Sequence, residues 1–222
     1  MKNNRRQFVK QTTAAIAGLS IVPRHVLGKG YTAPSDRFNL GVIGTGAQSS
    51  GLIKRLSKIP QARVIAGCDV HQKRLVKFSQ LIEEQYQMYG VKGKAEVHED
   101  YEKLLENSDI DGVVVSTPDH WHAIPAIDAM KAGKHVYCEK PMSHTINEGR
   151  MMEKVARKYN RVLQTGSMQR SRADFRKACE LVRNGYLGKI EKVWVEVGNP
   201  SAPCDLPYQA TPNYLNWERW LG

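Results

Sequence analysis

Short apolar runs alternate with amphipathic stretches along residues 38–165 of this 222-residue chain. The apolar runs predict strands at residues 38–43, 62–68, 96–98, 112–116, 135–138 and 162–165. The stretches between them carry apolar residues at helical spacing, which predicts helices at residues 48–58, 69–89, 101–106, 122–132 and 145–159. Strands that alternate with helices across short turns predict an α/β fold with a doubly wound parallel sheet.

The pattern changes after Gly166. Residues 172–184 predict a helix that Gly185 ends, and residues 189–197 alternate polar and apolar side chains. Such alternation is typical of a half-exposed antiparallel strand, so residues 167–222 are expected to begin a second, α+β domain. A single strand cannot form a core of its own. We therefore expect this second domain to be truncated and its unpaired strand to favour aggregation.

A glycine-rich turn, Gly41-Val-Ile-Gly44-Thr-Gly46-Ala-Gln-Ser49, separates the first predicted strand from the first predicted helix. A Rossmann-type dinucleotide fingerprint belongs at this position. Gly44 would allow the tight turn, and Gly46 would let a pyrophosphate approach the backbone at the positive end of the helix. Ser49 stands where the third glycine is usual, so the motif alone is a weak signal.

Asp69 strengthens this interpretation because it follows the second predicted strand at the expected distance. A carboxylate there accepts hydrogen bonds from the adenosine ribose hydroxyls and repels a 2′-phosphate, which favours NAD over NADP. No arginine follows Asp69 immediately. The simpler alternative is that Asp69 caps the next helix, and the position is compatible with both roles.

A polar turn, Ser116-Thr-Pro-Asp-His-Trp-His122, follows the fourth predicted strand, at the sheet edge where ligands bind. Its two histidines and one aspartate suggest a metal site, but the sequence contains no further cluster of ligands. We interpret the turn as one that caps a helix and contacts a cofactor, and we predict no metal.

The motif Glu139-Lys140-Pro141 follows the fifth predicted strand. One alternative is a surface ion pair that ends the strand. The other is that Lys140 donates a hydrogen bond to a substrate hydroxyl, raises its acidity and stabilises the alkoxide as a hydride leaves. Glu139 would then fix the position of Lys140 or tune its pKa.

Together these motifs resemble the glucose–fructose oxidoreductase/inositol dehydrogenase (Gfo/Idh/MocA) family, from about Asp36 to the end of the chain. The segment Asn216-Trp-Glu-Arg-Trp-Leu-Gly222 adds to the resemblance. The resemblance implies an NAD-binding Rossmann domain at residues 36–166, with Lys140 as the catalytic lysine. The residues that it implies for cofactor binding are Gly44, Thr45, Gly46, Ala47, Gln48, Asp69, Thr117, Pro118, His122, Glu139 and Arg170. The first six would hold adenosine and pyrophosphate, the next four would line the nicotinamide side, and Arg170 would lie near cofactor or substrate.

The activity implied by the resemblance is hydride transfer between NAD and a sugar, cyclitol or related polyol, by an enzyme that is a homo-oligomer at full length. Family members carry an Asp/His proton-transfer pair in the second domain. These 222 residues do not reach that region, so we expect the fragment to bind NAD without catalysis. One alternative is an exported NAD-dependent glycoside hydrolase, although its lysine is expected to be altered and Lys140 is intact. Another is a non-catalytic nucleotide-binding fragment.

The net charge of +11 suggests nucleic-acid binding only until its distribution is considered. Residues 1–28 carry five positive charges and no acidic residue, so the remainder carries 11 − 5 = +6. That excess is mixed with Glu and Asp along the predicted helices. The distribution indicates a solvated surface and not a phosphate footprint, and we predict no nucleic-acid partner.

Residues 1–28 combine a basic start, including Arg5-Arg6, with an apolar run from Thr12 to Val22. This is typical of a twin-arginine signal, and residues 29–35 would be a linker. The prediction is a periplasmic protein exported by the twin-arginine machinery, which the segment could also keep at the membrane. The alternative is a basic tail on a cytoplasmic protein. The four cysteines show no zinc-type spacing and imply no disulfide.

Overall fold

The computed structural model describes residues 32, 36–200 and 202–222, so the predicted signal segment and nearly all of the predicted linker lie outside the described residues. A six-stranded parallel sheet forms the centre, with strands in the order β3-β2-β1-β4-β5-β6. The strands are β1 (Phe38–Ile43), β2 (Ala62–Cys68), β3 (Glu96–His98), β4 (Gly112–Val115), β5 (His135–Glu139) and β6 (Leu163–Gly166). The predicted α/β fold with a doubly wound parallel sheet is confirmed.

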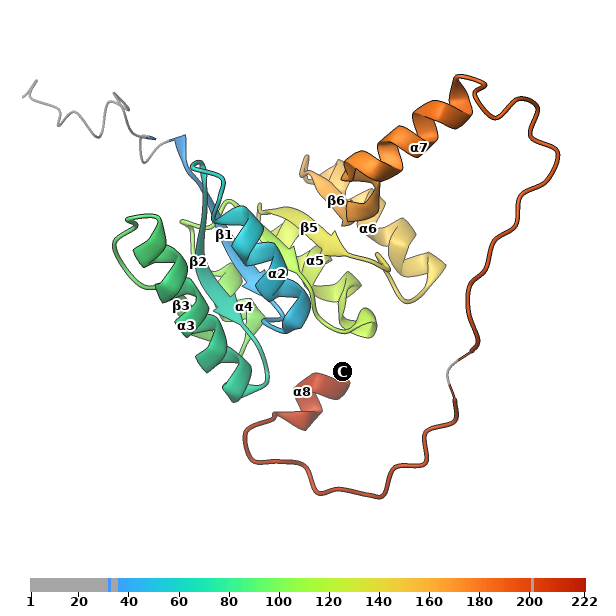
Figure 1. Ribbon diagram of the computed structural model, residues 1–222. Coiled ribbons are helices and arrows are strands. Elements are labelled where there is room, and N and C mark those ends of the chain that lie inside the picture. The colour runs from blue at the N-terminus through green and yellow to red at the C-terminus, as the bar shows by residue number, and fades with distance from the viewer. Residues whose placement is uncertain (1–31, 33–35, 201) are drawn as a thin grey trace, which may run out of the picture.

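Helices join successive strands and cover both faces of the sheet (Figure 1). The helices on one face are α2 (Ala47–Leu56) and α3 (Gln72–Met88), and those on the other are α4 (Tyr101–Leu105), α5 (Ala123–Lys131) and α6 (Ile146–Lys158). Side chains alternate between the faces of a strand. In β4, Val114 therefore packs in the core beneath α2 and α3, whereas Val113 and Val115 pack in the opposite core.

The order of strands reverses between β1 and β4. β1 pairs with β2 on one side and with β4 on the other, and the chain crosses over after β3 to reach β4. The turns that follow Ile43 and Val115 therefore leave the same edge of the sheet side by side. In open parallel sheets, ligands bind in the crevice at such a switch point.

Local sequence explains where several helices begin. Thr145 and Glu148 form a capping box that starts α6. His71 has extended backbone (φ −114°, ψ 102°) and is the N-cap of α3, so this helix begins at Gln72 and not at residue 69 as predicted. The other predicted boundaries differ from the observed ones by no more than two residues.

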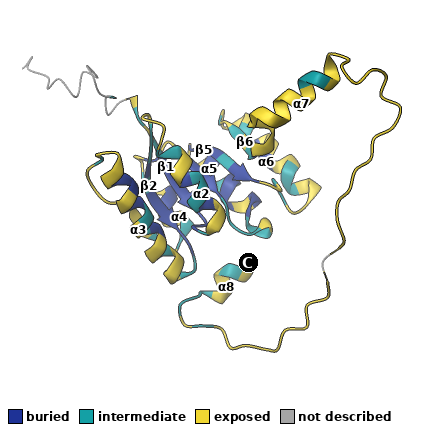
Figure 2. Ribbon diagram, in the orientation of Figure 1, coloured by how far each residue is buried: buried dark blue, intermediate teal, exposed yellow. Residues whose placement is uncertain are grey.

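The predicted strand at residues 189–197 is wrong. Beyond β6 the chain forms a 3₁₀ turn η3 (Met168–Ser171) and helix α7 (Ala173–Arg183), and then extends away from the sheet without regular structure (Figure 1). A β-strand exists through hydrogen bonds to a neighbour, and no described segment pairs with residues 189–197. Their side chains are exposed (Figure 2): Trp194 is 83% exposed and Val197 is 90% exposed.

The segment around helix α8 (Trp217–Leu221) returns to the Rossmann domain. His71 and Leu215 form an antiparallel bridge, and Asn216 N donates to Val70 O over 3.0 Å. Among the described helices, α8 included, none has the length and apolar character needed to cross a membrane.

Candidate functional site: the carboxyl edge of the sheet

The turn after β1 contains a glycine in the left-handed conformation. Gly44 has φ +87°, and its N–H donates to Cys68 O over 2.8 Å. A Cβ at Gly44 would lie 2.7 Å from backbone atoms of Ser116 and Thr117. Only glycine fits here without strain, and its lack of a side chain lets the turns after β1 and β4 pack together.

The first turn of α2 is open to a ligand. Gly46 is the N-cap without a side-chain cap, and the first turn contains no acidic residue. The first amides of a helix lack intrahelical partners, and the helix dipole adds positive partial charge there. Ala47 and Gln48 are exposed on this turn, and the nearest atom to a Cβ placed at Gly46 would be Arg74 Nη1, at 3.7 Å. These features fit a pyrophosphate group.

Asp69 lies at the end of β2, buried beside the glycine turn. Its Oδ2 accepts hydrogen bonds from Thr45 N (2.8 Å) and Thr45 Oγ1 (3.1 Å), and its Oδ1 accepts one from His71 N (2.9 Å). Because His71 is the N-cap of α3, the alternative that Asp69 caps this helix is wrong. Arg74 Nη1 lies 4.0 Å from Asp69 Oδ2. Sequence reasoning missed this arginine because it lies five residues after Asp69, in the first turn of α3, and not directly after it.

His122 ties the turn after β4 to the turn after β5. Its buried ring lies with Nδ1 2.5 Å from Pro141 O and Nε2 2.9 Å from Thr117 O. The ring contacts are therefore to backbone carbonyls, and a contact between His122 and a cofactor stays a prediction. The described residues include no group of three or more His, Cys, Asp and Glu side chains that could hold a metal ion.

Glu139 and Lys140 follow one another at the carboxyl end of β5. Glu139 is buried, and its carboxylate accepts hydrogen bonds from Gln48 Nε2 (2.9 Å), Tyr137 Oη (3.4 Å) and the Lys140 backbone N–H (3.2 Å). Burial and the adjacent carboxylate raise the pKa of Tyr137, so its hydroxyl remains a donor. Lys140 is exposed and forms no ion pair with Glu139, so the alternative of a surface ion pair is wrong. Glu139 instead fixes the backbone at Lys140.

Arg170 lies farther along the edge, in η3 after β6, with its side chain exposed. It lines a surface hollow together with Phe175 and Arg176, and this hollow contains no other predicted site residue. Its position near cofactor or substrate stays a prediction.

A cavity of about 80 Å³ lies over the ends of β1, β2 and β4, and four of the predicted site residues line it: Gly44, Asp69, Thr117 and Pro118. A larger open hollow of about 790 Å³ runs along α6 but contains no predicted site residue. The candidate site is therefore identified by the residues that line it and not by its volume. The cavity lining that sequence reasoning missed includes Arg74, Tyr101, Trp121, Arg219 and Trp220. The last two reach the edge from α8, through contacts too distant in sequence to leave a local signal.

These groups fit a dinucleotide. The open amides of α2 would hold the pyrophosphate, Asp69 would face the adenosine ribose, and the turn after β5 would lie beside the nicotinamide. Thr117 and Pro118, expected on the nicotinamide side, instead line the cavity beside Asp69. Lys140 then stands at the nicotinamide end of the edge, on the strand next to β4.

Comparison with known proteins bears on the family and on the class of cofactor. Residues 38–167, more than half of the chain, match the Gfo/Idh/MocA family model, described as an oxidoreductase family with an NAD-binding Rossmann fold. An "uncharacterized oxidoreductase YrbE" of Bacillus subtilis (strain 168) is 28% identical over 163 residues, which cover 73% of this chain and 45% of the relative. A "glycosyl hydrolase family 109 protein" of Solibacter usitatus is 33% identical over 159 residues, covering 66% of this chain and 35% of the relative.

Two solved structures bear on the cofactor. A scyllo-inositol dehydrogenase from Lactobacillus casei, with bound NAD(H) and scyllo-inositol, is 28% identical with a TM-score of 0.58, covering 68% of this chain and 42% of that one. The 3-ketoreductase KijD10 from Actinomadura kijaniata, in complex with NADP and TDP-benzene, is 27% identical with a TM-score of 0.58. The match covers 67% of this chain and 43% of that one.

The chain spans less than half the length of these relatives and structures. Within that span, the family match covers all six strands and the edge that carries Gly44, Asp69 and Lys140. This protein therefore belongs to the Gfo/Idh/MocA family of oxidoreductases, through its NAD-binding Rossmann domain.

Proposed function

We propose that this protein is an NAD-dependent oxidoreductase that transfers a hydride between nicotinamide and a hydroxyl-bearing carbon of a sugar, cyclitol or related polyol. The observation that carries the proposal is the position of Lys140, exposed at the end of β5 on the same edge as the glycine turn and Asp69. The bound cofactor supplies the hydride acceptor.

Lys140 would bind the substrate. Its ammonium donates a hydrogen bond to the reacting hydroxyl oxygen, which favours the alkoxide from which hydride leaves. Glu139 supports this role from beneath, because its hydrogen bond to the Lys140 N–H (3.2 Å) fixes where the lysine side chain begins. Gln48 holds Glu139 in turn, over 2.9 Å, and so couples the cofactor turn to the lysine.

NAD is the proposed cofactor, with NADP a weaker ligand. Asp69 offers acceptor oxygens to ribose hydroxyls and a negative charge that repels a 2′-phosphate. The nearby guanidinium of Arg74, at 4.0 Å, reduces this repulsion, and similar structures contain either cofactor.

The isolated 222 residues are expected to bind NAD without turning over a polyol. Lys140 is open to solvent, and residues 188–200, which follow α7, extend away from the sheet (Figure 1). Hydride transfer requires an oriented substrate in a site from which water is excluded. Turnover of a polyol by this chain alone would contradict the expectation.

A second candidate is NAD-dependent glycoside hydrolysis by transient oxidation and elimination, favoured by relatives named as glycosyl hydrolases of family 109. The two reactions differ in their products. The test incubates the protein, as the cell makes it, with NAD and a panel of inositols, hexoses and aryl glycosides. Net NADH formation that Lys140→Ala abolishes supports the dehydrogenase. Release of the aryl group without net NADH supports the hydrolase. Absence of both products would contradict both candidate functions.

Export by the twin-arginine machinery to the periplasm, and a homo-oligomeric state, are also part of the proposal. Folding before export would carry the cofactor out with the protein. Cell fractionation of the protein and of its Arg5→Lys/Arg6→Lys variant tests the route, with periplasmic protein expected for the first and cytoplasmic protein for the second. Equal periplasmic amounts would contradict it.

A further inference from the structure

The segment Tyr214–Gly222, here called the strap, lies across the carboxyl edge beside Asp69. Its backbone is joined to the start of α3, since Gln72 N donates to Tyr214 O (2.9 Å) and Asn216 N donates to Val70 O (3.0 Å). The ring of His71 packs against the ring of Tyr214, with centroids 4.9 Å apart. These contacts fix one end of the strap two residues from the predicted ribose-binding carboxylate.

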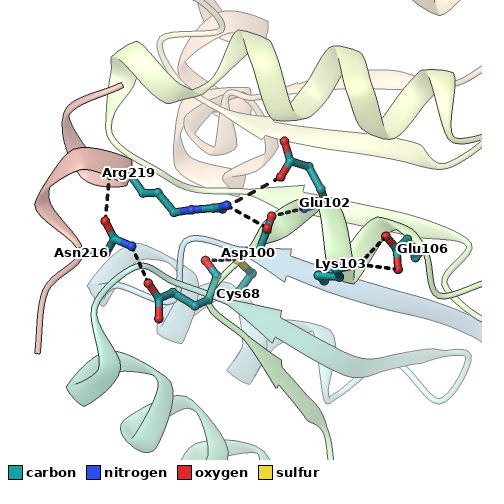
Figure 3. A network of polar contacts seen from close by, with 8 residues as sticks. Cys68, Asp100, Glu102, Lys103, Glu106, Asn216 and Arg219 are labelled. Carbon is teal, nitrogen blue, oxygen red and sulfur yellow. Dashed lines mark hydrogen bonds and ion pairs between the residues drawn. The ribbon is translucent and has the colours of Figure 1, made fainter.

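Side chains hold the rest of the strap (Figure 3). Arg219 Nη2 donates to Asp100 Oδ2 over 2.9 Å, and Asn216 Nδ2 donates to Glu99 Oε1 over 2.7 Å. At the far end, the Trp220 carbonyl oxygen accepts a hydrogen bond from Trp121 Nε1 (3.0 Å). The strap is therefore tied both to the residues after β3 and to the turn after β4.

The cavity of about 80 Å³ lies between the strap and the sheet. Its lining combines apolar and polar residues: the apolar ones include Ile43, Val70, Pro118, Trp121 and Trp220, and the polar ones include Asp69, Arg74 and Tyr101. A purine nucleoside requires this combination, because its base presents flat apolar faces and its ribose presents hydroxyls.

We propose that the strap forms the outer wall of the adenosine subsite, with Trp220 contacting the adenosine and Arg219 positioning the strap. The proposal rests on the binding of NAD at the carboxyl edge. Docking of the strap and binding of the dinucleotide then reinforce each other, because adenosine would lie between the strap and the sheet and contact both.

The strap moves outward when adenosine enters. The cavity is small beside the roughly 300 Å³ of ordinary small-molecule sites. Helix α8 contains no buried residue, and its ion pair with Asp100 is partly exposed, so this helix is the part of the strap that can shift while the backbone hydrogen bonds of Tyr214 and Asn216 remain. Adenosine would add apolar contact with Trp220, which is only partly buried.

The first test measures the affinity of the full chain for ADP-ribose and for nicotinamide mononucleotide by calorimetry. Trp220→Ala is expected to weaken ADP-ribose binding by about tenfold, as for loss of one base-stacking contact. Arg219→Ala, which loosens the strap and leaves Trp220 in place, is expected to weaken it by a smaller factor. Nicotinamide mononucleotide binding stays unchanged in both. The matched controls are Trp194→Ala and Arg150→Ala, which change exposed residues away from the cavity.

The second test follows amide hydrogen exchange of residues 214–222. Slower exchange on addition of ADP-ribose supports the proposal. Faster exchange, or tighter ADP-ribose binding by Trp220→Ala, would show that the strap competes with the nucleotide and would overturn it. Unchanged affinity for ADP-ribose in both strap variants would also overturn the proposed role of the strap, while NAD binding at this edge would stand. Failure of the folded wild-type chain to bind either ADP-ribose or NAD would overturn the proposed function itself.

Discussion

The backbone N–H of Thr45 donates to Asp69 Oδ2 over 2.8 Å, and the Thr45 hydroxyl donates to the same oxygen over 3.1 Å. This pair joins the glycine turn after β1 to the end of β2. It leaves Asp69 Oδ1, which accepts from His71 N, with the larger share of free acceptor capacity. One carboxylate thus holds the turn in place and faces the position proposed for the ribose.

Asp69→Asn separates these two functions. Asparagine keeps an acceptor for Thr45 but loses the negative charge that disfavours a 2′-phosphate, while Arg74 remains within reach. We expect the preference for NAD over NADP, measured as the ratio of the two Kd values by calorimetry, to fall by about tenfold, the equivalent of ~1.4 kcal/mol. An unchanged ratio would mean that Asp69 does not face the ribose.

Gly44→Ala is expected to destabilise the domain by about 1–3 kcal/mol, because φ is +87° and the new Cβ would lie 2.7 Å from the backbone of Ser116 and Thr117. Gly51→Ala is the matched control. Gly51 lies within α2, and no atom outside the backbone of its own helix lies within 4 Å of its Cβ position, so alanine there is expected to raise the free energy of unfolding by up to about 1 kcal/mol. Urea unfolding of both variants measures the difference, and equal stabilities would contradict the turn geometry.

The four cysteines are expected to differ in reactivity. All four are free thiols; Cys68 and Cys138 are buried, and burial raises the pKa of each to about 12. Because the thiolate is the reactive species, a thiol reagent at pH 8 should modify Cys179 and Cys204 quickly and the other two only after unfolding. Rapid modification of four thiols in the folded protein would contradict the packing around β2 and β5.

The strap should be sensitive to acid through Asp100. The hydrogen bond from Arg219 lowers the pKa of Asp100 from its usual 3.8 to about 2. A lowered pKa means that this interaction contributes fully above about pH 4 and is lost as the pH falls toward 2. Arg219→Ala should return the Asp100 pKa toward 3.8, as measured by NMR titration of its carboxyl carbon. A pKa that is the same in both proteins would show that Arg219 does not reach Asp100 in solution.

The sheet could be predicted from the sequence because its signals are local. The run Val113–Val115 is buried on both faces, and three β-branched residues in a row are typical of such a strand in a parallel sheet. Ser49 at the third glycine position also proved compatible with the turn, since its buried hydroxyl donates to Gly46 O over 2.8 Å. A small polar side chain at this position can therefore form its hydrogen bond within the turn.

The strap and the strand predicted at residues 189–197 could not be judged from local sequence. Alternation of polar and apolar residues indicates that a segment suits a sheet, but a strand also needs a partner, and the described residues offer none. Arg219 meets Asp100 across more than a hundred residues, so neither periodicity nor spacing indicated that α8 would lie beside Asp69. Contacts between residues so far apart in the sequence cannot be predicted from local patterns and are seen only in the folded structure.

NAD titration of the wild-type chain and of Gly44→Ala, by calorimetry below the unfolding temperature of both, tests whether the cofactor binds at the glycine turn after β1. We expect saturable one-to-one binding by the wild type and a loss of at least about tenfold in affinity for the variant, because the pyrophosphate turn is displaced. Folded wild-type protein that shows no saturable binding, or equal affinity in the two proteins, would contradict the placement of the cofactor at this edge of the sheet.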